Sequence, residues 1–145
     1  MSNIIVPLSW SLKTGDHIAL KADDGLYLSR INRGDTNPIE AAKTSIDVYS
    51  QFKVTVLVNS QIALQADTGL YLSRINRGSI NPIEAAKSSI DVYSQFTFTL
   101  LDDGTLSLRA DDGLYLSRIN RGDINPIEAA KNSIDVFSQF KVILL

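Results

Sequence analysis

The ten-residue string GLYLSRINRG occurs three times in this chain, at residues 25–34, 69–78 and 113–122. Three longer segments around it align without a gap: residues 24–53, 68–97 and 112–141. They follow one another at a constant spacing of 44 residues, and 24 of their 30 aligned positions are identical in all three copies. Such repeats are typical of folds built from equivalent units. An open array of units needs atypical capping repeats. Because the chain shows none, we expect the repeats to close around an axis.

Each repeat contains four short segments with the character of β-strands. HIALKA alternates apolar and polar residues, as a half-buried strand does, and the DDG turn that follows it suits a tight hairpin. The loop NRGDTNP separates the second strand from the third. The third, IEAAKT, has a helical turn as its alternative because its residues favour helix, although a helix this short is not expected to persist. In the first repeat the expected strands are residues 17–22, 26–31, 39–44 and 51–57.

Four strands in each of three repeats predict an all-β fold of twelve strands with pseudo-threefold symmetry, and this pattern matches a β-trefoil. We expect a single domain over residues 1–145, with repeats at about 14–57, 58–101 and 102–145. The predicted core consists of Leu20, Leu28, Ile46, Phe52, Val54 and their counterparts in the other repeats. The N-terminal strip, residues 1–13 with Trp10, has no repeat partner, so we expect it to supply the first barrel strand or to fill a subunit interface.

Composition excludes several classes of function. The net charge of −2 provides no basic excess to neutralise a phosphate backbone, so we expect no nucleic-acid partner. The absence of cysteine rules out disulfides and thiolate metal sites, and we expect no metal and no cofactor. No stretch has the apolar length of a membrane span, and the first residues lack the pattern of a secretory signal. We therefore expect a cytoplasmic or non-classically released protein that does not insert into membranes.

Two motifs carry a resemblance to known β-trefoils. The hairpin DxGLYLSRI resembles that of fascin-like and agglutinin-type trefoils, and the segment 41–54 is similar to one in amaranthin-type agglutinins. The chain as a whole, over residues 14–145, looks like the small β-trefoil lectins of mushroom fruiting bodies. It departs from the ricin type, because Gln51-Phe52 stands where a Gln-x-Trp motif would close the repeat. The resemblance implies a lectin for glycans or glycoproteins ending in galactose or N-acetylgalactosamine, including the T-antigen disaccharide, with up to three equivalent sites.

The loop Asn32–Pro38 is the candidate binding site. Its Asn, Arg, Gly and Pro residues recur unchanged, while the strands around it have diverged. Amide and guanidinium groups suit sugar hydroxyls, and a glycine lets backbone N–H groups approach a ligand. The predicted site residues are Arg30, Asn32, Arg33, Gly34, Asp35, Asn37, Arg74, Asn76, Arg77, Gly78, Ser79, Asn81, Arg118, Asn120, Arg121, Gly122, Asp123 and Asn125. Site two differs from the others, because Ser79 replaces Asp35 and Asp123.

An aromatic ring is expected to face the apolar side of the sugar. Two sets of residues qualify as this platform: Tyr49, Tyr93 and Phe137, or Tyr27, Tyr71 and Tyr115. Structural roles compete with ligand binding at other positions. Gly34 and Pro38 fit a left-handed turn and the start of the next strand. Asp23 and Asp24 fit a turn, and Asp47 fits a turn cap.

The remaining alternatives concern chemistry and partners. Glu40 is interpreted as an exposed strand residue paired with Lys43, and not as half of a catalytic carboxylate pair. The only histidine, His17, is in one repeat, so no catalytic triad can be built three times, and we expect no enzyme. The RGD tripeptide is absent from the second copy, so we interpret it as a chance match. The alternative function is a structural, actin-binding or protein-binding trefoil of the fascin type, and a homodimer is left open.

Overall fold

A computed structural model describes residues 4–5 and 11–145 of the chain. They form 13 strands and three short 3-10 helices. In chain order these are β1 Ile4–Ile5, β2 His17–Lys21, β3 Tyr27–Arg30, β4 Ile39–Lys43, η1 Val48–Ser50, β5 Phe52–Leu57, β6 Gln61–Gln65, β7 Tyr71–Arg74, β8 Ile83–Lys87, η2 Val92–Ser94, β9 Phe96–Leu100, β10 Thr105–Arg109, β11 Tyr115–Arg118, β12 Ile127–Lys131, η3 Val136–Ser138 and β13 Phe140–Leu144. Twelve strands thus belong to the repeats, as the sequence predicts.

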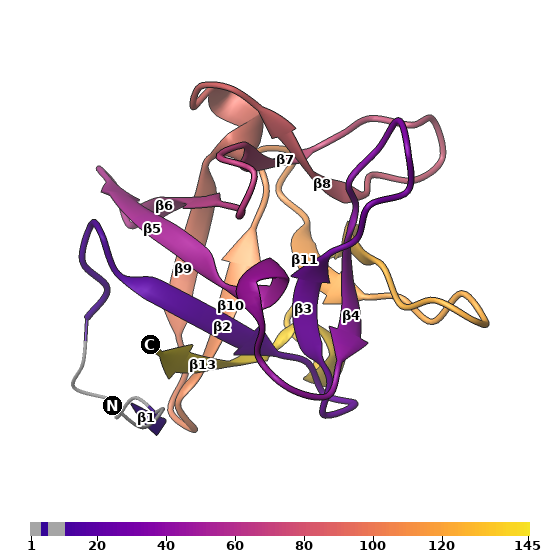
Figure 1. Cartoon of the computed structure of the whole chain (residues 1–145). Coiled ribbons are helices and arrows are strands. Elements are labelled where there is room, and N and C mark those ends of the chain that lie inside the picture. Colours follow the sequence, from indigo (N-terminus) through magenta and orange to yellow (C-terminus); the bar gives the residue numbers. More distant parts are fainter. Residues whose placement is uncertain (1–3, 6–10) are drawn as a thin grey trace.

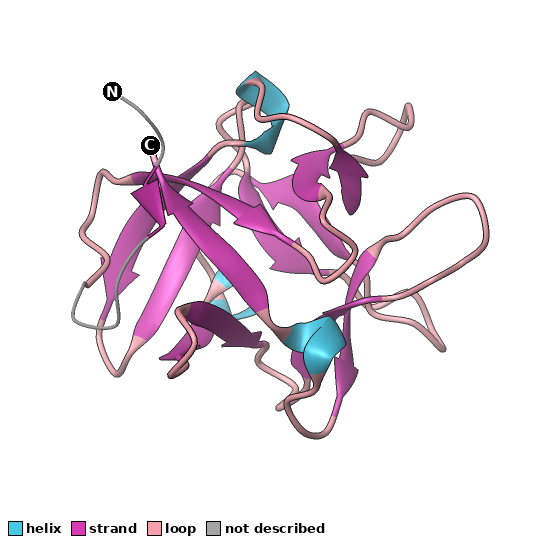
Figure 2. Ribbon diagram, turned by 90° about the horizontal axis from the view of Figure 1, so that it is seen from below, coloured by secondary structure: helices cyan, strands magenta, loops and turns pink. Residues whose placement is uncertain are grey.

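Six of these strands form a closed antiparallel barrel: β2, β5, β6, β9, β10 and β13. Neighbouring strands along the chain pair across short turns, and β13 returns to β2 in a register that places Val142 opposite Leu20. This last pairing joins the third repeat to the first and closes the ring. The three 3-10 helices are spread around the barrel (Figure 2). The predicted closure around an axis is confirmed.

The other strands form one hairpin in each repeat, and the three hairpins cover one end of the barrel: β3–β4, β7–β8 and β11–β12. A main-chain hydrogen bond ties each hairpin to the preceding repeat around the ring. The N–H of Ala41 in the first repeat donates to the carbonyl of Asn125 in the third, and equivalent bonds run from Ala85 to Asn37 and from Ala129 to Asn81. The loops of the three hairpins project away from the end of the molecule where β1 and β13 lie (Figure 1).

The barrel interior is filled by the same side chains from every repeat. Phe52, Phe96 and Phe140 are completely buried, and burial of each phenyl ring contributes about 2–3 kcal/mol. The predicted core residues Leu20, Leu28 and Val54 are also buried. Ile46 is only half-buried, so its assignment to the core was wrong: it lies in the connection before η1 and not on a strand. The counterpart of Val54 in the second repeat, Phe98, packs against the core while partly exposed.

The structure also defines two segments for which the sequence left alternatives open. Residues 39–43 form a strand and not a helical turn, because pairing with β3 outweighs the helical preference of IEAAK. Within the N-terminal strip, β1 pairs with β13, with Ile4 opposite Leu144, and so adds a strand beside the barrel. The first barrel strand is instead β2. Trp10 lies outside the described residues.

Candidate functional site

The predicted binding loops are exposed turns at the tips of the three hairpins (Figure 1). In the first repeat the N–H of Arg33 donates to the carbonyl of Thr36 at 3.0 Å, which closes the turn. Gly34 has φ of 80°, a left-handed conformation that favours glycine. Its N–H donates to Oδ1 of Asn32 at 3.0 Å. The turns of the other two repeats have the same bonds. The turn-forming interpretation of Gly34 is therefore confirmed.

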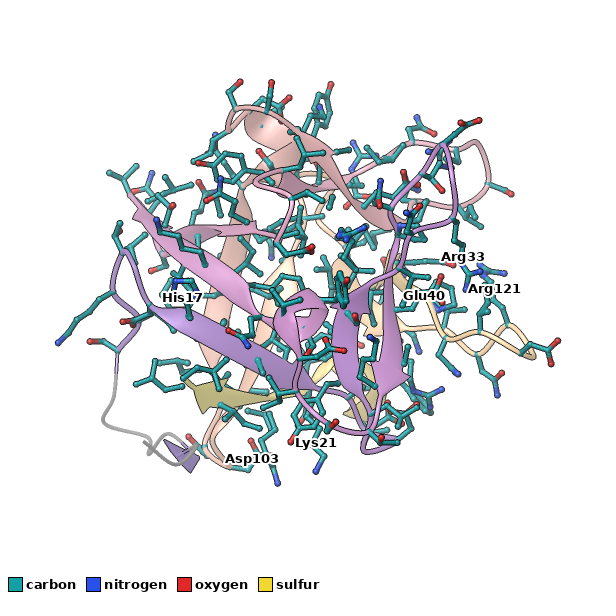
Figure 3. The ribbon with its side chains drawn as sticks, viewed as in Figure 1. His17, Lys21, Arg33, Glu40, Asp103 and Arg121 are labelled. Carbon is teal, nitrogen blue, oxygen red and sulfur yellow. The ribbon has the colours of Figure 1, made fainter. Side chains whose placement is uncertain are left out.

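Arg33 forms a two-pronged ion pair with Glu40. Its Nε and Nη2 donate to the two carboxylate oxygens at 2.6 and 2.7 Å. The Glu40 side chain is 3% exposed, so the prediction of an exposed glutamate paired with Lys43 was wrong. The hydrogen bond to Glu40 raises the pKa of Arg33 above its ordinary value. Arg77–Glu84 and Arg121–Glu128 repeat the pair. In Figure 3, Arg33, Glu40 and Arg121 lie at the hairpin end of the molecule, away from His17.

Arg30 connects one repeat to the next. Its Nε and Nη2 donate to the carboxylate of Asp67, in the first turn of the second repeat, at 2.7 and 2.9 Å. Its Nη1 donates to Oδ1 of Asn37 at 2.6 Å. Arg74–Asp111 and Arg118–Asp23 repeat the arrangement, so three ion pairs form a closed cycle around the barrel. The first aspartate of each turn therefore holds neighbouring repeats together.

One shallow pocket lies in each repeat between the hairpin and the 3-10 helix. The three pockets have volumes of about 270, 240 and 190 Å³. They are lined by equivalent residues: Arg30, Ile31, Asn32, Lys43 and Tyr49; Arg74, Ile75, Asn76, Lys87 and Tyr93; Arg118, Ile119, Asn120, Lys131 and Phe137. We call these the repeat pockets.

The repeat pockets bring together only part of the predicted site. Arg30, Asn32 and their counterparts in the other repeats line the pockets. The aromatic set of Tyr49, Tyr93 and Phe137 lines them as well. Four other predicted residues and their counterparts do not line the pockets: Arg33, Gly34, Asp35 and Asn37. Sequence reasoning did not assign Ile31 or Lys43 to the site. Their identity in all three repeats was visible in the sequence, but nothing in the spacing placed residue 43 beside residue 30.

The aromatic residue of each pocket is held by its 3-10 helix. Asp47 caps η1 by accepting a hydrogen bond from the N–H of Tyr49 at 3.0 Å, which confirms the predicted turn cap. The Tyr49 ring is partly exposed, and it packs against two cations: the guanidinium carbon of Arg30 is 5.3 Å from the ring centroid and Nζ of Lys43 is 5.0 Å from it. Phe137 makes the same contacts without a hydroxyl group, so these contacts depend on the ring alone.

The cap gives the protein an expected acid sensitivity. The hydrogen bond from Lys43 is the main cause that holds the pKa of Asp47 below its ordinary value of 3.8, and Asp91 and Asp135 are lowered in the same way by Lys87 and Lys131. A carboxylate with a lowered pKa in the folded state stabilises the protein above its unfolded-state pKa, and this stability is lost as the pH falls through the folded value. We expect the free energy of unfolding to decrease below about pH 4.

Chemical denaturation at pH 7, 4 and 3 measures this effect. Because these aspartates are about 40% exposed, each pair should contribute no more than about 1 kcal/mol. The variant with Lys43→Met, Lys87→Met and Lys131→Met is the control, and its stability should decrease less between pH 7 and pH 3. An equal decrease in both proteins would assign the acid sensitivity to other carboxylates.

A second kind of groove lies where adjacent repeats meet. One, of about 280 Å³, includes Val48, Gln51 and Asp67, and its counterpart between the third and first repeats, of about 350 Å³, includes Val136, Gln139 and Asp23. The described residues that line these grooves include no phenylalanine, tyrosine or tryptophan, and His17 lines the smaller groove. Each contains an aspartate that is already paired with an arginine of the neighbouring repeat. Sequence reasoning did not predict these grooves.

Within residues 4–5 and 11–145, no cluster of three acidic or histidine residues is placed to hold a metal ion. The same part of the chain contains no helix with the length and apolar character needed to cross a membrane.

Comparison with known proteins identifies the architecture. No family model and no curated protein matches the sequence. Among solved structures, a designed threefold-symmetric protein, ThreeFoil, superposes with a TM-score of 0.79 at 20% identity, over 89% of this chain and 99% of that one. A BEL β-trefoil superposes with a TM-score of 0.74 at 13% identity, over 97% of this chain and 100% of that one. The fold is a β-trefoil.

A third similar structure is the Polyporus squamosus lectin, crystallised with the epitope Neu5Acα2-6Galβ1-4GlcNAc. It superposes with a TM-score of 0.74 at 9% identity, and the match covers 91% of this chain and 50% of the lectin. At these identities the three similarities establish the β-trefoil fold and leave the ligand to be argued from the site.

Proposed function

We propose that this β-trefoil is a lectin with three equivalent saccharide sites, one in each repeat pocket, and that it binds glycans ending in galactose or N-acetylgalactosamine. The observation that carries the proposal is that equivalent residues form the same pocket three times on one rigid barrel. Each pocket combines an aromatic ring, an amide and two cationic groups, which suits a ligand with one apolar face and several hydroxyls. The similar fold of a lectin that was crystallised with a glycan supports the same class of function.

The geometry also explains why three sites are useful. A small open pocket binds a single sugar weakly, with a dissociation constant of about 1 mM. Three such pockets on one body raise the overall affinity for clustered glycans, because the second and third contacts form at a high effective concentration. The protein would thus act by binding several glycan ends at once, without catalysing a reaction.

The proposed site divides the predicted residues into three groups. Those that line the pockets contact the sugar: Arg30, Asn32, Arg74, Asn76, Arg118 and Asn120. Arg33 and Asn37 support the hairpin through their bonds to Glu40 and Arg30. Gly34 and Asp35 lie at the loop tip, and their contact with a longer saccharide stays a prediction. The galactose preference comes from the resemblance to mushroom and amaranthin-type agglutinins.

Calorimetric titration with the best ligand from a glycan array tests the proposal. We expect about three sugars bound per chain, and Tyr49→Ala is expected to reduce this number to two because it removes one ring. The matched control is Tyr49→Phe, which introduces the residue found in the third repeat and should keep three sites. An array without any bound saccharide would contradict the proposal, and equal stoichiometry for Tyr49→Ala would place the sites elsewhere.

A further inference from the structure

The hydrogen-bonding groups that remain available in the repeat pockets are mostly donors. Arg30 has five N–H groups, and three of them donate to Asp67 and Asn37. Lys43 has three, and one donates to Asp47. Within the described residues, two N–H groups on each cation therefore have no hydrogen-bond acceptor in the protein. The amide of Asn32 contributes further donors, because its oxygen already accepts from Gly34.

The carboxylates that pair with these cations stand outside the pocket wall. Arg30 and Lys43 line the pocket, whereas Asp67 and Asp47 do not. The same holds in the other repeats, where Arg74 and Lys87 line the pocket, as do Arg118 and Lys131. A ligand in any of the three pockets thus meets two cationic groups and no acid among the lining residues.

A neutral hydroxyl group both donates and accepts, so a wall of donors satisfies only half of its capacity. A carboxylate or sulfate is an acceptor at every oxygen, and its hydrogen bonds to charged donors are roughly twice as strong as neutral ones. We propose that the repeat pockets recognise the anionic group of an acidic saccharide, a carboxylate or a sulfate ester carried on the terminal sugars. This inference rests on the proposed function, since it specifies that the galactose bound in the same pockets carries an acidic substituent, either a sulfate ester or a sialic acid.

The third repeat strengthens the argument. Phe137 has no hydroxyl, so the acceptor that Tyr49 and Tyr93 could offer is missing there, while the arginine, lysine and asparagine are retained. The features shared by all three pockets are therefore the cationic and amide donors and the aromatic ring. A ligand that is bound equivalently by three sites must be recognised through these shared groups.

Titrations of the full chain with three ligands test the inference: lactose, lactose with a sulfate ester on galactose, and sialylated lactose. We expect the two acidic ligands to bind about tenfold more tightly than lactose, and this preference to decrease with added salt. Preference for only one acidic ligand would support the inference and identify which anionic group fits. Equal affinity for all three would overturn it, while leaving the lectin proposal in place. Failure of every saccharide to bind would instead contradict the proposed function.

Two triple variants locate the effect. Lys43→Gln, Lys87→Gln and Lys131→Gln together remove the pocket lysines, and we expect the affinity ratio of sulfated to neutral lactose to approach one. Lys21→Gln, Lys53→Gln and Lys141→Gln remove the same charge outside the repeat pockets and should keep the ratio. Thermal unfolding of both variants shows that each is folded. An equal loss in both would overturn the inference, because net charge alone would then explain the preference.

Discussion

Asp23→Ala is expected to lower the free energy of unfolding by about 3 kcal/mol, equivalent to a decrease of roughly 10 °C in the melting temperature. Asp23 accepts two hydrogen bonds from Arg118, which lies 95 residues later in the chain, at 2.8 and 2.9 Å. Both side chains are nearly buried, with exposed fractions of 13% for Asp23 and 12% for Arg118. Without the carboxylate, the guanidinium stays largely shielded from water, and its remaining ion pair among the described residues is a 3.8 Å contact between Nε and Asp24.

The neighbouring residue provides a matched control. Asp24 lies in the same turn, and its carboxylate accepts from the N–H of Leu26 at 3.0 Å. In the second repeat Thr68 performs this function for Leu70, so Asp24→Thr retains the turn. The substitution also removes a 3.8 Å contact with Nε of Arg118, and it should change the stability by less than about 0.5 kcal/mol. Denaturant titration of both variants measures the difference. Similar stabilities for Asp23→Ala and Asp24→Thr would contradict the role assigned to the ion pair.

A double-mutant cycle separates the ion pair from other effects of the substitution. If Asp23 stabilises the fold through Arg118, the combined change of both residues should cost much less than the sum of the two single changes. This ion pair also joins the last repeat to the first, together with the pairing of β13 and β2. Loss of the contact weakens the closure of the ring, which an open array of repeats would not need.

The fold could be predicted from the sequence because its determinants are local and repeated. The spacing of 44 residues, the alternation in the barrel strands and the Gly-containing turns give the number and order of the strands directly. β4 buries three consecutive residues, Ile39, Glu40 and Ala41, and the barrel strands β2, β6 and β10 each bury three in a row as well, so burial does not alternate there. The hairpins pack against one another through their edges, so the sequence pattern did not show that Glu40 is inside.

The candidate site was harder to predict because it depends on contacts between distant residues. The partner of Arg30 is 37 residues later, in the next repeat, and the sequence does not specify how two repeats face each other. Lys43 reaches the same pocket only because β4 pairs with β3 in a particular register. Invariance of the loop indicated that these residues matter, but it did not separate residues that support the hairpin from residues that could contact a ligand.

Arg33→Ala decides whether this loop residue supports the hairpin or contacts a ligand. If its function is to pair with Glu40, the substitution leaves a nearly buried carboxylate without a partner and should lower the free energy of unfolding by about 2 kcal/mol. This value is at the lower end for buried pairs because the Arg33 side chain is 43% exposed and water can replace part of it. Arg109→Ala, at an exposed arginine, should change the stability by less than about 0.5 kcal/mol.

A second variant distinguishes loss of the pair from loss of the residue. Arg33→Met combined with Glu40→Leu removes both charges, and it should recover most of the stability lost in Arg33→Ala, since apolar residues of similar size can replace a buried ion pair. Saccharide binding measured in the same proteins should remain near its original strength in the double variant, because neither residue lines a repeat pocket. If the double variant is stable but binds one sugar fewer per chain, this result would show that Arg33 contacts the saccharide. The identity of the three loops would then reflect ligand contact as well as the need to neutralise Glu40.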